Sequence, residues 1–417
     1  MKNLTFLRLV SVLLLLAPVA VASTTWYVDG VNGNDRNDCK TRQTACKTIK
    51  HAIYLASPGD SIKVAPATYH ERLVINIGLK IVGSGANTTI FDGQSLGIYR
   101  VVQVSNTLLP VTISNVTIRN ADLGGGIWNT GVLTIIDSVI TGNRAYGACL
   151  FRPCNHYGGG IWNDGGTLTI IATSVTGNSA YTDCGTPGCS GPDMGGGIYN
   201  VGGTLTIYNS TIAGNTVGNI LRSNASLPHE TLAHEPLGGG IYNAGTGTIN
   251  NSTIESNIAY DNGSGGGIYN QYMLAISNGT ITDNIVDGLG LGGGIFNNFS
   301  STTILQNSIV ANSPSGGNCA GTIDSSGYNL SSDGTCNFNN AGDLNNVDPL
   351  LGPLENNGGP TYTQALLPRS PAIDAGNPSG CTDEQGHLLK IDQRGYPRPD
   401  KEDTGGCDMG AYERQSD

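Results

Sequence analysis

The chain has 417 residues, with 21 Lys and Arg against 32 Asp and Glu, and a formal net charge of −11 at pH 7. This acidic balance argues against nucleic acid or an anionic membrane surface as a partner, because both are bound through basic patches. Glycine accounts for 61 residues and charged residues for only 13%. Such a composition would suit a disordered chain, but the sequence keeps an apolar periodicity that disordered chains lack.

Residues 1–22 have the pattern of a secretory signal peptide. Lys2 and Arg8 precede the apolar run 9–17, and small residues stand at 20–22. The run is too short to span a bilayer, and no later stretch is apolar enough for a transmembrane helix. We therefore expect a secreted monomer without a transmembrane segment, either extracellular or held at a bacterial cell surface.

Residues 23–110 are expected to form an N-terminal cap and the first coils of a solenoid. A strand is predicted at 26–28, a short helix at 48–56, and further strands at 61–65, 74–77, 79–82 and 88–91. The motifs YVDG…NGND, KTIKHAI and PGDSIKVAPATYHE resemble the N-terminus of exported right-handed β-helix proteins, in which the helix caps the open end. A cap is needed physically, because the first coil would otherwise expose its core and a bare sheet edge.

The phrase Gly-Gly-Gly-Ile-aromatic-Asn occurs six times within residues 111–312, beginning at residues 124, 158, 195, 238, 265 and 292. The shortest interval, 27 residues, lies in the range of solenoid repeats. Alternation along a strand places Ile127 and Trp128 on opposite faces, and stacked coils bring like residues to ~4.8 Å. The pattern predicts an all-β fold, a single-stranded right-handed parallel β-helix similar to that of pectate lyases, with an N-terminal helical cap.

The repeated glycines and asparagines are expected to be structural. Glycine suits tight bends and close passage of neighbouring coils. The asparagine side chains can bond from coil to coil as a ladder, and a second asparagine recurs near the end of each repeat, at residues 143, 178, 215, 257, 284 and 312. A catalytic role is disfavoured, because a catalytic site needs one residue of a kind and a ladder needs many.

Ten cysteines fall into close neighbours along the chain. An even count in an exported protein favours local disulfides over zinc sites, whose tight two-pair spacing is missing. The predicted pairs are Cys39–Cys46, Cys149–Cys154, Cys184–Cys189, Cys319–Cys336 and Cys381–Cys407.

Residues 313–417 are expected to form the last coils and a C-terminal region. The segments 348–377, 392–399 and 407–413, with the motifs DQRGYPRP and CDMGAYE, resemble the choice-of-anchor Q domain. The six repeats also loosely resemble those of polymorphic outer-membrane proteins. These resemblances imply a solenoid fold and an exported context.

The aromatic residue of each repeat is the candidate ligand-binding position. Rings on the outer face at ~4.8 Å spacing would form a strip suited to stacking on sugars or on a protein partner. The alternative is that the rings stack on one another beneath the inserted loops, since long exposed apolar strips are uncommon. The six residues are Trp128, Trp162, Tyr199, Tyr242, Tyr269 and Phe296.

We assign no catalytic residue. A polysaccharide lyase needs carboxylates for Ca²⁺ and a nearby Lys or Arg as base, and the repeat arginines Arg144, Arg152 and Arg222 lie in insert loops. The sequence favours a non-catalytic exported protein, an adhesion or glycan-contact scaffold whose partner is a polysaccharide or a surface protein. The alternative is a pectate-lyase-like polysaccharide lyase or a glycoside hydrolase, which a cluster of Asp with Arg in a groove would support.

Two segments contain residue types that could bind a metal ion. Asp29, Asn32, Asn34, Asp35 and Asp38 offer oxygens suited to Ca²⁺, but the same side chains suit turn capping, and no cofactor is otherwise expected. In the segment 229–235, His229 and Glu230 are followed by His234, which is one residue farther away than the second histidine of the zinc-protease motif HExxH. We expect this segment to be a solvated loop.

Overall fold

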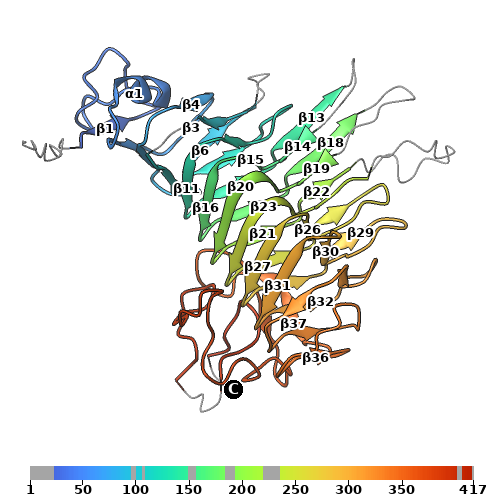
Figure 1. Ribbon diagram of the computed structural model, residues 1–417. Coiled ribbons are helices and arrows are strands. Elements are labelled where there is room, and N and C mark those ends of the chain that lie inside the picture. The colour runs from blue at the N-terminus through green and yellow to red at the C-terminus, as the bar shows by residue number, and fades with distance from the viewer. Residues whose placement is uncertain are drawn as a thin grey trace, which may run out of the picture.

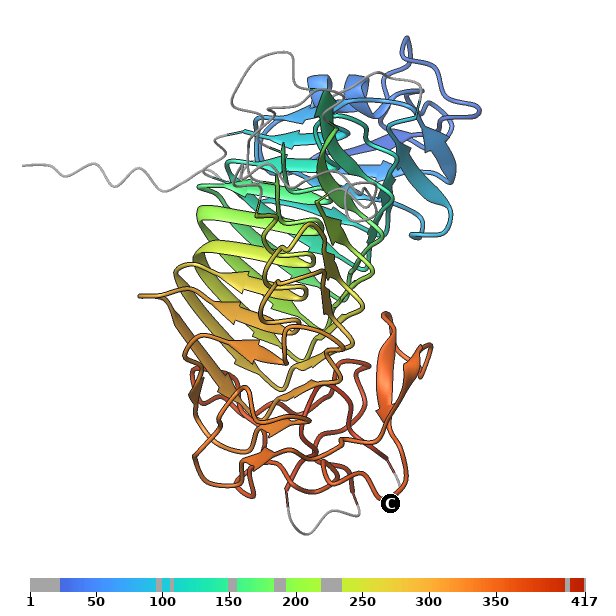
Figure 2. The same cartoon turned by 90° about the vertical axis from the view of Figure 1, so that its right-hand side faces the viewer.

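The computed structural model describes residues 23–94, 100–105, 109–148, 156–183, 193–218, 235–401 and 406–415. The signal peptide predicted at 1–22 lies outside these residues. The chain forms a parallel β-helix whose coils stack along one long axis, with the N-terminal cap at one end and the C-terminal region at the other (Figures 1 and 2). The predicted fold class is confirmed. In the described segments no helix has the length and apolar character needed to cross a bilayer.

The N-terminal cap contains the one helix found in the described part of the chain, α1 (Ile49–Leu55). Thr48 is its N-cap, and the Thr48 hydroxyl accepts a hydrogen bond from the His51 backbone N–H. Glu71 accepts from two further N–H groups of the first turn, those of Ile49 and Lys50. Ile49 and Ala52 are fully buried, so the helix covers the first coil as predicted.

The largest sheet, sheet A, carries two short strands per coil in most coils and merges them into one longer strand in two of them. Among the described residues its 18 strands are β1 (Thr25–Val28), β2 (Ser61–Val64), β4 (Leu73–Ile75), β5 (Lys80–Val82), β7 (Val102–Val104), β8 (Val111–Ser114), β10 (Ile127–Asn129), β11 (Val132–Ile136), β15 (Ile161–Asp164), β16 (Thr167–Ile171), β20 (Ile198–Tyr208), β23 (Ile241–Asn250), β26 (Ile268–Asn270), β27 (Met273–Ser277), β30 (Ile295–Asn297), β31 (Thr302–Gln306), β33 (Cys319–Ala320) and β34 (Asp324–Ser325).

Two smaller parallel sheets complete the coils. Sheet B consists of β3 (Ala67–Tyr69), β6 (Thr89–Asp92), β9 (Thr117–Arg119), β12 (Val139–Thr141), β17 (Ser174–Thr176), β21 (Thr211–Ala213), β24 (Thr253–Glu255), β28 (Thr280–Thr282), β32 (Ile309–Ala311), β35 (Leu330–Ser331) and β36 (Leu344–Asn345). Sheet C consists of β13 (Arg144–Ala148), β18 (Ser179–Asp183), β22 (Thr216–Val217), β25 (Ile258–Ala259) and β29 (Ile285–Val286). Beside sheet C, β14 (His156–Tyr157) pairs with β19 (Asp193–Met194).

Equivalent residues of successive repeats lie directly opposite one another. Ile127 pairs with Ile161, and Trp128 pairs with Trp162. The isoleucine of every repeat phrase is fully buried. The core is therefore a set of aliphatic columns along the solenoid axis, each built from one repeat position.

Two ladders of buried asparagine run beside these columns. In the first, Nδ2 of each residue donates to Oδ1 of the next at 2.7–2.9 Å, through Asn129, Asn163, Asn200, Asn243, Asn270 and Asn297. In the second the same bond measures 2.9–3.0 Å, through Asn143, Asn178, Asn215, Asn257 and Asn284. No member is more than 3% exposed. The predicted laddering is confirmed except at Asn312, which is exposed and bonds through its backbone N–H to Ser332.

The glycines of the repeat phrase serve two different needs. Gly195, the first of its triplet, has φ +66°, a left-handed conformation that a side chain would strain. A Cβ on Gly196 would lie 2.2 Å from the carbonyl oxygen of Thr216 and 2.5 Å from that of Gly239. The first glycine thus makes the bend, and the second lets adjacent coils approach.

The C-terminal region folds back along the outer face of sheet B. The Gln393 side chain donates to Thr211 and accepts from Thr253, which belong to neighbouring coils. Arg398 forms a fully buried ion pair with Glu413 at 2.7 Å. The antiparallel hairpin β37 (Leu351–Glu355) and β38 (Thr363–Leu366) precedes these segments. The motif residues of this region therefore attach it to the solenoid.

Three of the predicted disulfides are present: Cys39–Cys46, Cys319–Cys336 and Cys381–Cys407. The pairs Cys149–Cys154 and Cys184–Cys189 lie outside the described residues. Each observed bridge closes a short segment in the cap or near the C-terminus, where the repeat pattern is weak.

Removing one rung of the first ladder should destabilise the protein. Asn200→Ala deletes the acceptor of Asn163 and the donor to Asn243, so we expect a loss of about 1–3 kcal/mol of unfolding free energy. Urea or thermal denaturation measures it. Thr204→Ala, on the exposed face of the same strand, is the control and should change stability by no more than about 0.5 kcal/mol. Equal stability of the two variants would contradict the ladder's role.

Candidate functional site

The six repeat aromatics form a continuous column on the outer face of sheet A. The rings of Tyr199, Tyr242, Tyr269 and Phe296 stack face to face with centroids 4.9–5.3 Å apart. At the N-terminal end the arrangement changes, because Trp162 meets Tyr199 edge-on at 6.2 Å, and the two tryptophans are tilted at 6.0 Å. The column is thus regular along most of its length and irregular where it ends in tryptophan.

Most of the column is covered. Tyr199, Tyr242 and Tyr269 are 4–8% exposed. Tyr157, Met194 and Leu237, which lie just before their repeat phrases, pack on the column, and Tyr157 stacks on Tyr199 at 4.5 Å. Burial raises the pKa of Tyr199 and Tyr242. The middle of the predicted binding strip therefore serves packing, and the rings that keep partial exposure are Trp128, Trp162 and Phe296.

Arg100 lies over the tryptophan end of the column. Its Cζ is 4.5 Å from the ring centroid of Trp128 and 5.1 Å from that of Trp162. Nε of Arg100 and Nε1 of Trp162 are buried and have no hydrogen-bond partner among the protein atoms of the described chain. An unpaired buried donor costs about 1–3 kcal/mol. This end of the column is therefore rich in donors and short of acceptors.

Arg72, Gln103 and Asp164 complete this cluster. Arg72 donates to Oε1 of Gln103 at 2.8 Å, and Gln103 pairs in register with Trp128. Trp128 Nε1 donates to Asp164 at 3.3 Å. We name the six residues the arginine–tryptophan site: Arg72, Arg100, Gln103, Trp128, Trp162 and Asp164.

The electrostatics of the arginine–tryptophan site are dominated by Arg100. Burial lowers the pKa of its guanidinium, the charge of nearby Arg72 lowers it further, and Asp164 acts in the opposite direction. Asp164 is thus one carboxylate beside two guanidinium groups. The unbalanced positive charge favours an anionic ligand.

A hydroxyl, an imidazole and a carboxylate also meet beside the column. Thr182 donates its hydroxyl to Asp193 Oδ1 at 2.6 Å, and His156 Nδ1 lies 3.0 Å from the same hydroxyl. Thr182 is 2% exposed and its backbone N–H also bonds Asp193. Because the hydroxyl is buried and already donates to the carboxylate, the group joins β14, β18 and β19 and presents no accessible nucleophile.

The predicted calcium loop uses its carboxylates to cap turns. Asp29 accepts from the backbone of Val31 and Asn32, and Asp35 accepts from the backbone of Lys47. Calcium binding there stays a prediction, to be tested by titration. Within the described residues, the possible metal-ligand cluster is Cys39, Cys46 and His51, whose two sulfurs are joined in a disulfide and cannot supply thiolates. Residues 229–234, which contain the predicted zinc-protease-like segment, lie outside the described residues.

Arg72 and Arg100 belong to no repeat or motif that predicts a site from the sequence. The feature of the sequence that points to a cationic site is the uneven distribution of charge along the chain. Residues 23–120 contain ten Lys and Arg against six Asp and Glu, whereas residues 121–417 contain nine against 26. The cap and first coils are thus a positive end on an acidic protein, and the tryptophan end of the column lies beside it.

No protein-family model and no curated protein sequence matches the chain. It is similar in structure to a pectate lyase, Pel9A, with 14% identity, 95% of this chain and 98% of that chain covered, and a TM-score of 0.47. A rhamnogalacturonan lyase matches with 12% identity, coverage of 84% and 96%, and a TM-score of 0.42. XylC in complex with xylose matches with 11% identity, coverage of 94% and 98%, and a TM-score of 0.45. At such identities the likeness concerns the β-helix architecture alone, and the choice-of-anchor Q and outer-membrane repeat likenesses stay resemblances of motif.

Truncating a central ring of the column should cost stability. Tyr242→Ala removes a ring that stacks on two neighbours, so we expect a loss of about 3–5 kcal/mol in denaturation measurements, as for other buried aromatics. Tyr272→Ala is the matched control, since that ring is 58% exposed, and should cost no more than about 0.5 kcal/mol. A Tyr242→Ala variant as stable as the control would assign these rings to something other than packing.

Proposed function

We propose that the protein is an exported, non-catalytic scaffold that binds an acidic polysaccharide at the arginine–tryptophan site. The observation that supports the proposal is the Arg100 guanidinium over two partly buried tryptophans, with Arg72 nearby and one carboxylate, Asp164, against the two cations. A carboxylate of a sugar acid would balance the excess positive charge.

The chemistry of the site suits such a ligand in two ways. Indole faces pack against the apolar faces of sugar rings, and their N–H groups bond hydroxyl or carboxylate oxygens. Arginine recognises carboxylates through planar, charge-assisted hydrogen bonds. The positive balance of residues 23–120 would also draw a polyanion to this end of an otherwise acidic molecule.

The proposed setting is outside the cell, in solution or at the cell surface, with the protein acting as a monomer. The three disulfides support an oxidising compartment. Polysaccharides of cell walls and matrices are found there. The role we propose there is adhesion or glycan contact through one end of the solenoid.

Arg100→Gln and Trp162→Phe test the proposal. Loss of a charge-assisted bond should weaken binding of a polygalacturonate oligomer about 10- to 100-fold for Arg100→Gln. Trp162→Phe keeps an aromatic ring but replaces the larger indole face and removes the N–H group, so a loss of about 3- to 10-fold is expected. Isothermal titration calorimetry gives both values. Lys50→Gln, an exposed cation on α1, is the control and should bind like wild type; equal binding by all four proteins would exclude this site.

A polysaccharide lyase is the second candidate, and the feature that supports it is the arginine pair Arg72 and Arg100 beside the tryptophan end of the column. A lyase base removes the proton α to a uronate carboxylate, the glycosidic oxygen at the β position leaves, and a carbon–carbon double bond forms in the new sugar end. In this candidate Arg100 would be the proton acceptor, and Arg72 would neutralise the carboxylate.

One measurement separates the two candidates. A binding scaffold leaves polygalacturonate intact on prolonged incubation, which is the expected result. Unsaturated sugar ends that form with wild type and vanish with Arg100→Gln would replace the binding function by lyase activity. Incubation with and without added Ca²⁺ shows in addition whether turnover depends on that ion.

A further inference from the structure

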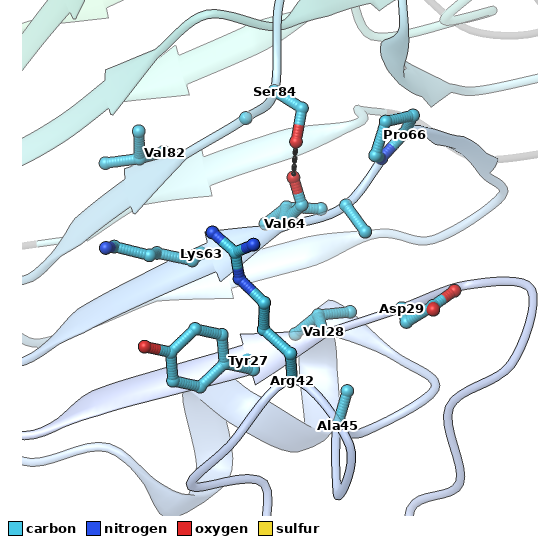
Figure 3. Close-up of a pocket in the computed structure, with 12 residues that line it drawn as sticks. Tyr27, Val28, Asp29, Arg42, Ala45, Lys63, Val64, Pro66, Val82 and Ser84 are labelled. Carbon is cyan, nitrogen blue, oxygen red and sulfur yellow. Dashed lines mark hydrogen bonds between the residues drawn. The ribbon is translucent and has the colours of Figure 1, made fainter.

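A second positive site lies on the same end of the molecule, between the cap and the outer face of sheet A. It is a cavity of about 390 Å³, lined by Tyr27, Arg42, Lys63 and Ser84 among others. Tyr27 and Lys63 pair in register on β1 and β2, so their side chains stand next to each other on the outer face. In Figure 3 the Arg42 side chain extends from its loop past Tyr27 toward Lys63.

Arg42 is held in place by its loop. The Cys39–Cys46 disulfide closes the loop on either side of Arg42. The two cysteines bond the backbone of Tyr27, since the Tyr27 N–H donates to the carbonyl of Cys39 and the Cys46 N–H donates to the carbonyl of Tyr27. The loop is thus fixed over β1, which reduces the entropy lost when Arg42 binds a ligand.

The two cations of this cavity are not neutralised by the protein. Neither Arg42 nor Lys63 forms an ion pair among the described residues, and both are exposed. Asp29 also lines the cavity, but its carboxylate accepts hydrogen bonds from Val31 and Asn32 of its own turn. Two unpaired cations against one carboxylate leave the cavity with a net positive charge, which favours an anion between Arg42 and Lys63.

Strand register connects this cavity with the arginine–tryptophan site. Lys63 lies opposite Val82 on β5, and Lys80 projects from the same face of β5, two residues earlier. Arg72 stands just before β4, the preceding strand of the same coil. Val74 on β4 pairs in register with Gln103 of the arginine–tryptophan site, and Val82 lines the cavity. The two valines are eight positions apart in the chain, which is at most about 26 Å along the strands at ~3.3 Å per residue. We name the row Arg100, Arg72, Lys80, Lys63 and Arg42 the cation row.

We propose that the acidic polysaccharide runs along the cation row, across the first coils, and that Arg42 and Lys63 hold a second anionic group of the same chain. This inference rests on the proposed function. A polymer with a carboxylate on each sugar supplies anions at both ends of the row, whereas a single sugar acid reaches only one. The ligand therefore lies parallel to the strands and crosses the solenoid axis.

The test compares short and long oligogalacturonates with the full chain. The double variant Arg42→Gln/Lys63→Gln should weaken a long oligomer about 3- to 10-fold, as expected for two exposed charge pairs, and leave a disaccharide unchanged. Arg100→Gln should weaken both ligands. Lys47→Gln/Lys50→Gln, which removes the same charge from exposed positions of the cap, is the control and should bind both like wild type.

Each outcome is decisive. If the double variant binds long oligomers like wild type while Arg100→Gln still weakens them, the cation row is overturned and the proposed function stands. If the control pair weakens long oligomers equally, the effect is one of net charge and the row is again overturned. If wild type binds neither ligand, both proposals fail. Tighter binding of a single-stranded DNA of equal charge than of the uronate would overturn the ligand class.

Discussion

The buried amide ladders are the constraint on which the rest of the structure depends. Burial of isoleucine drives the coils together, but that force is non-directional and would tolerate a shifted register. An asparagine amide buried beside it tolerates no such shift, because a misaligned rung leaves donors and acceptors unpaired in a region of low dielectric. Two ladders on different sides of each coil therefore fix both the stacking and the rotation of one coil on the next.

A fixed register decides what the outer face looks like. Tyr242 and Tyr269 stack nearly parallel because their strands are in register, not because the rings select each other. Where the column reaches the first coils, the register continues but the residue type changes from Trp128 to Gln103. A donor-rich edge results at that point, and the charged side chains of the cap lie next to it.

The repeat pattern predicts the fold because its information is local and periodic. Ile127 and Trp128 alternate in one strand, so their opposite faces can be read from the sequence, and the laddering of Asn129 follows from its repetition. The arginine–tryptophan site is different, since Arg100 belongs to an early coil with no repeat phrase and meets Trp128 only through tertiary packing. The return of Gln393 to Thr211 is likewise a contact between segments 182 residues apart that no periodicity marks.

Separation of charge along an elongated body makes this protein a macroscopic electric dipole. The surplus of basic residues in 23–120 and the surplus of acidic residues in 121–417 lie toward opposite ends of the long axis. Near a polyanionic matrix the field would repel the acidic coils and attract the basic cap, and the resulting torque would turn the molecule cap first toward the matrix. The coils beyond would then project away from the matrix as a stalk of fixed length, set by the number of repeats.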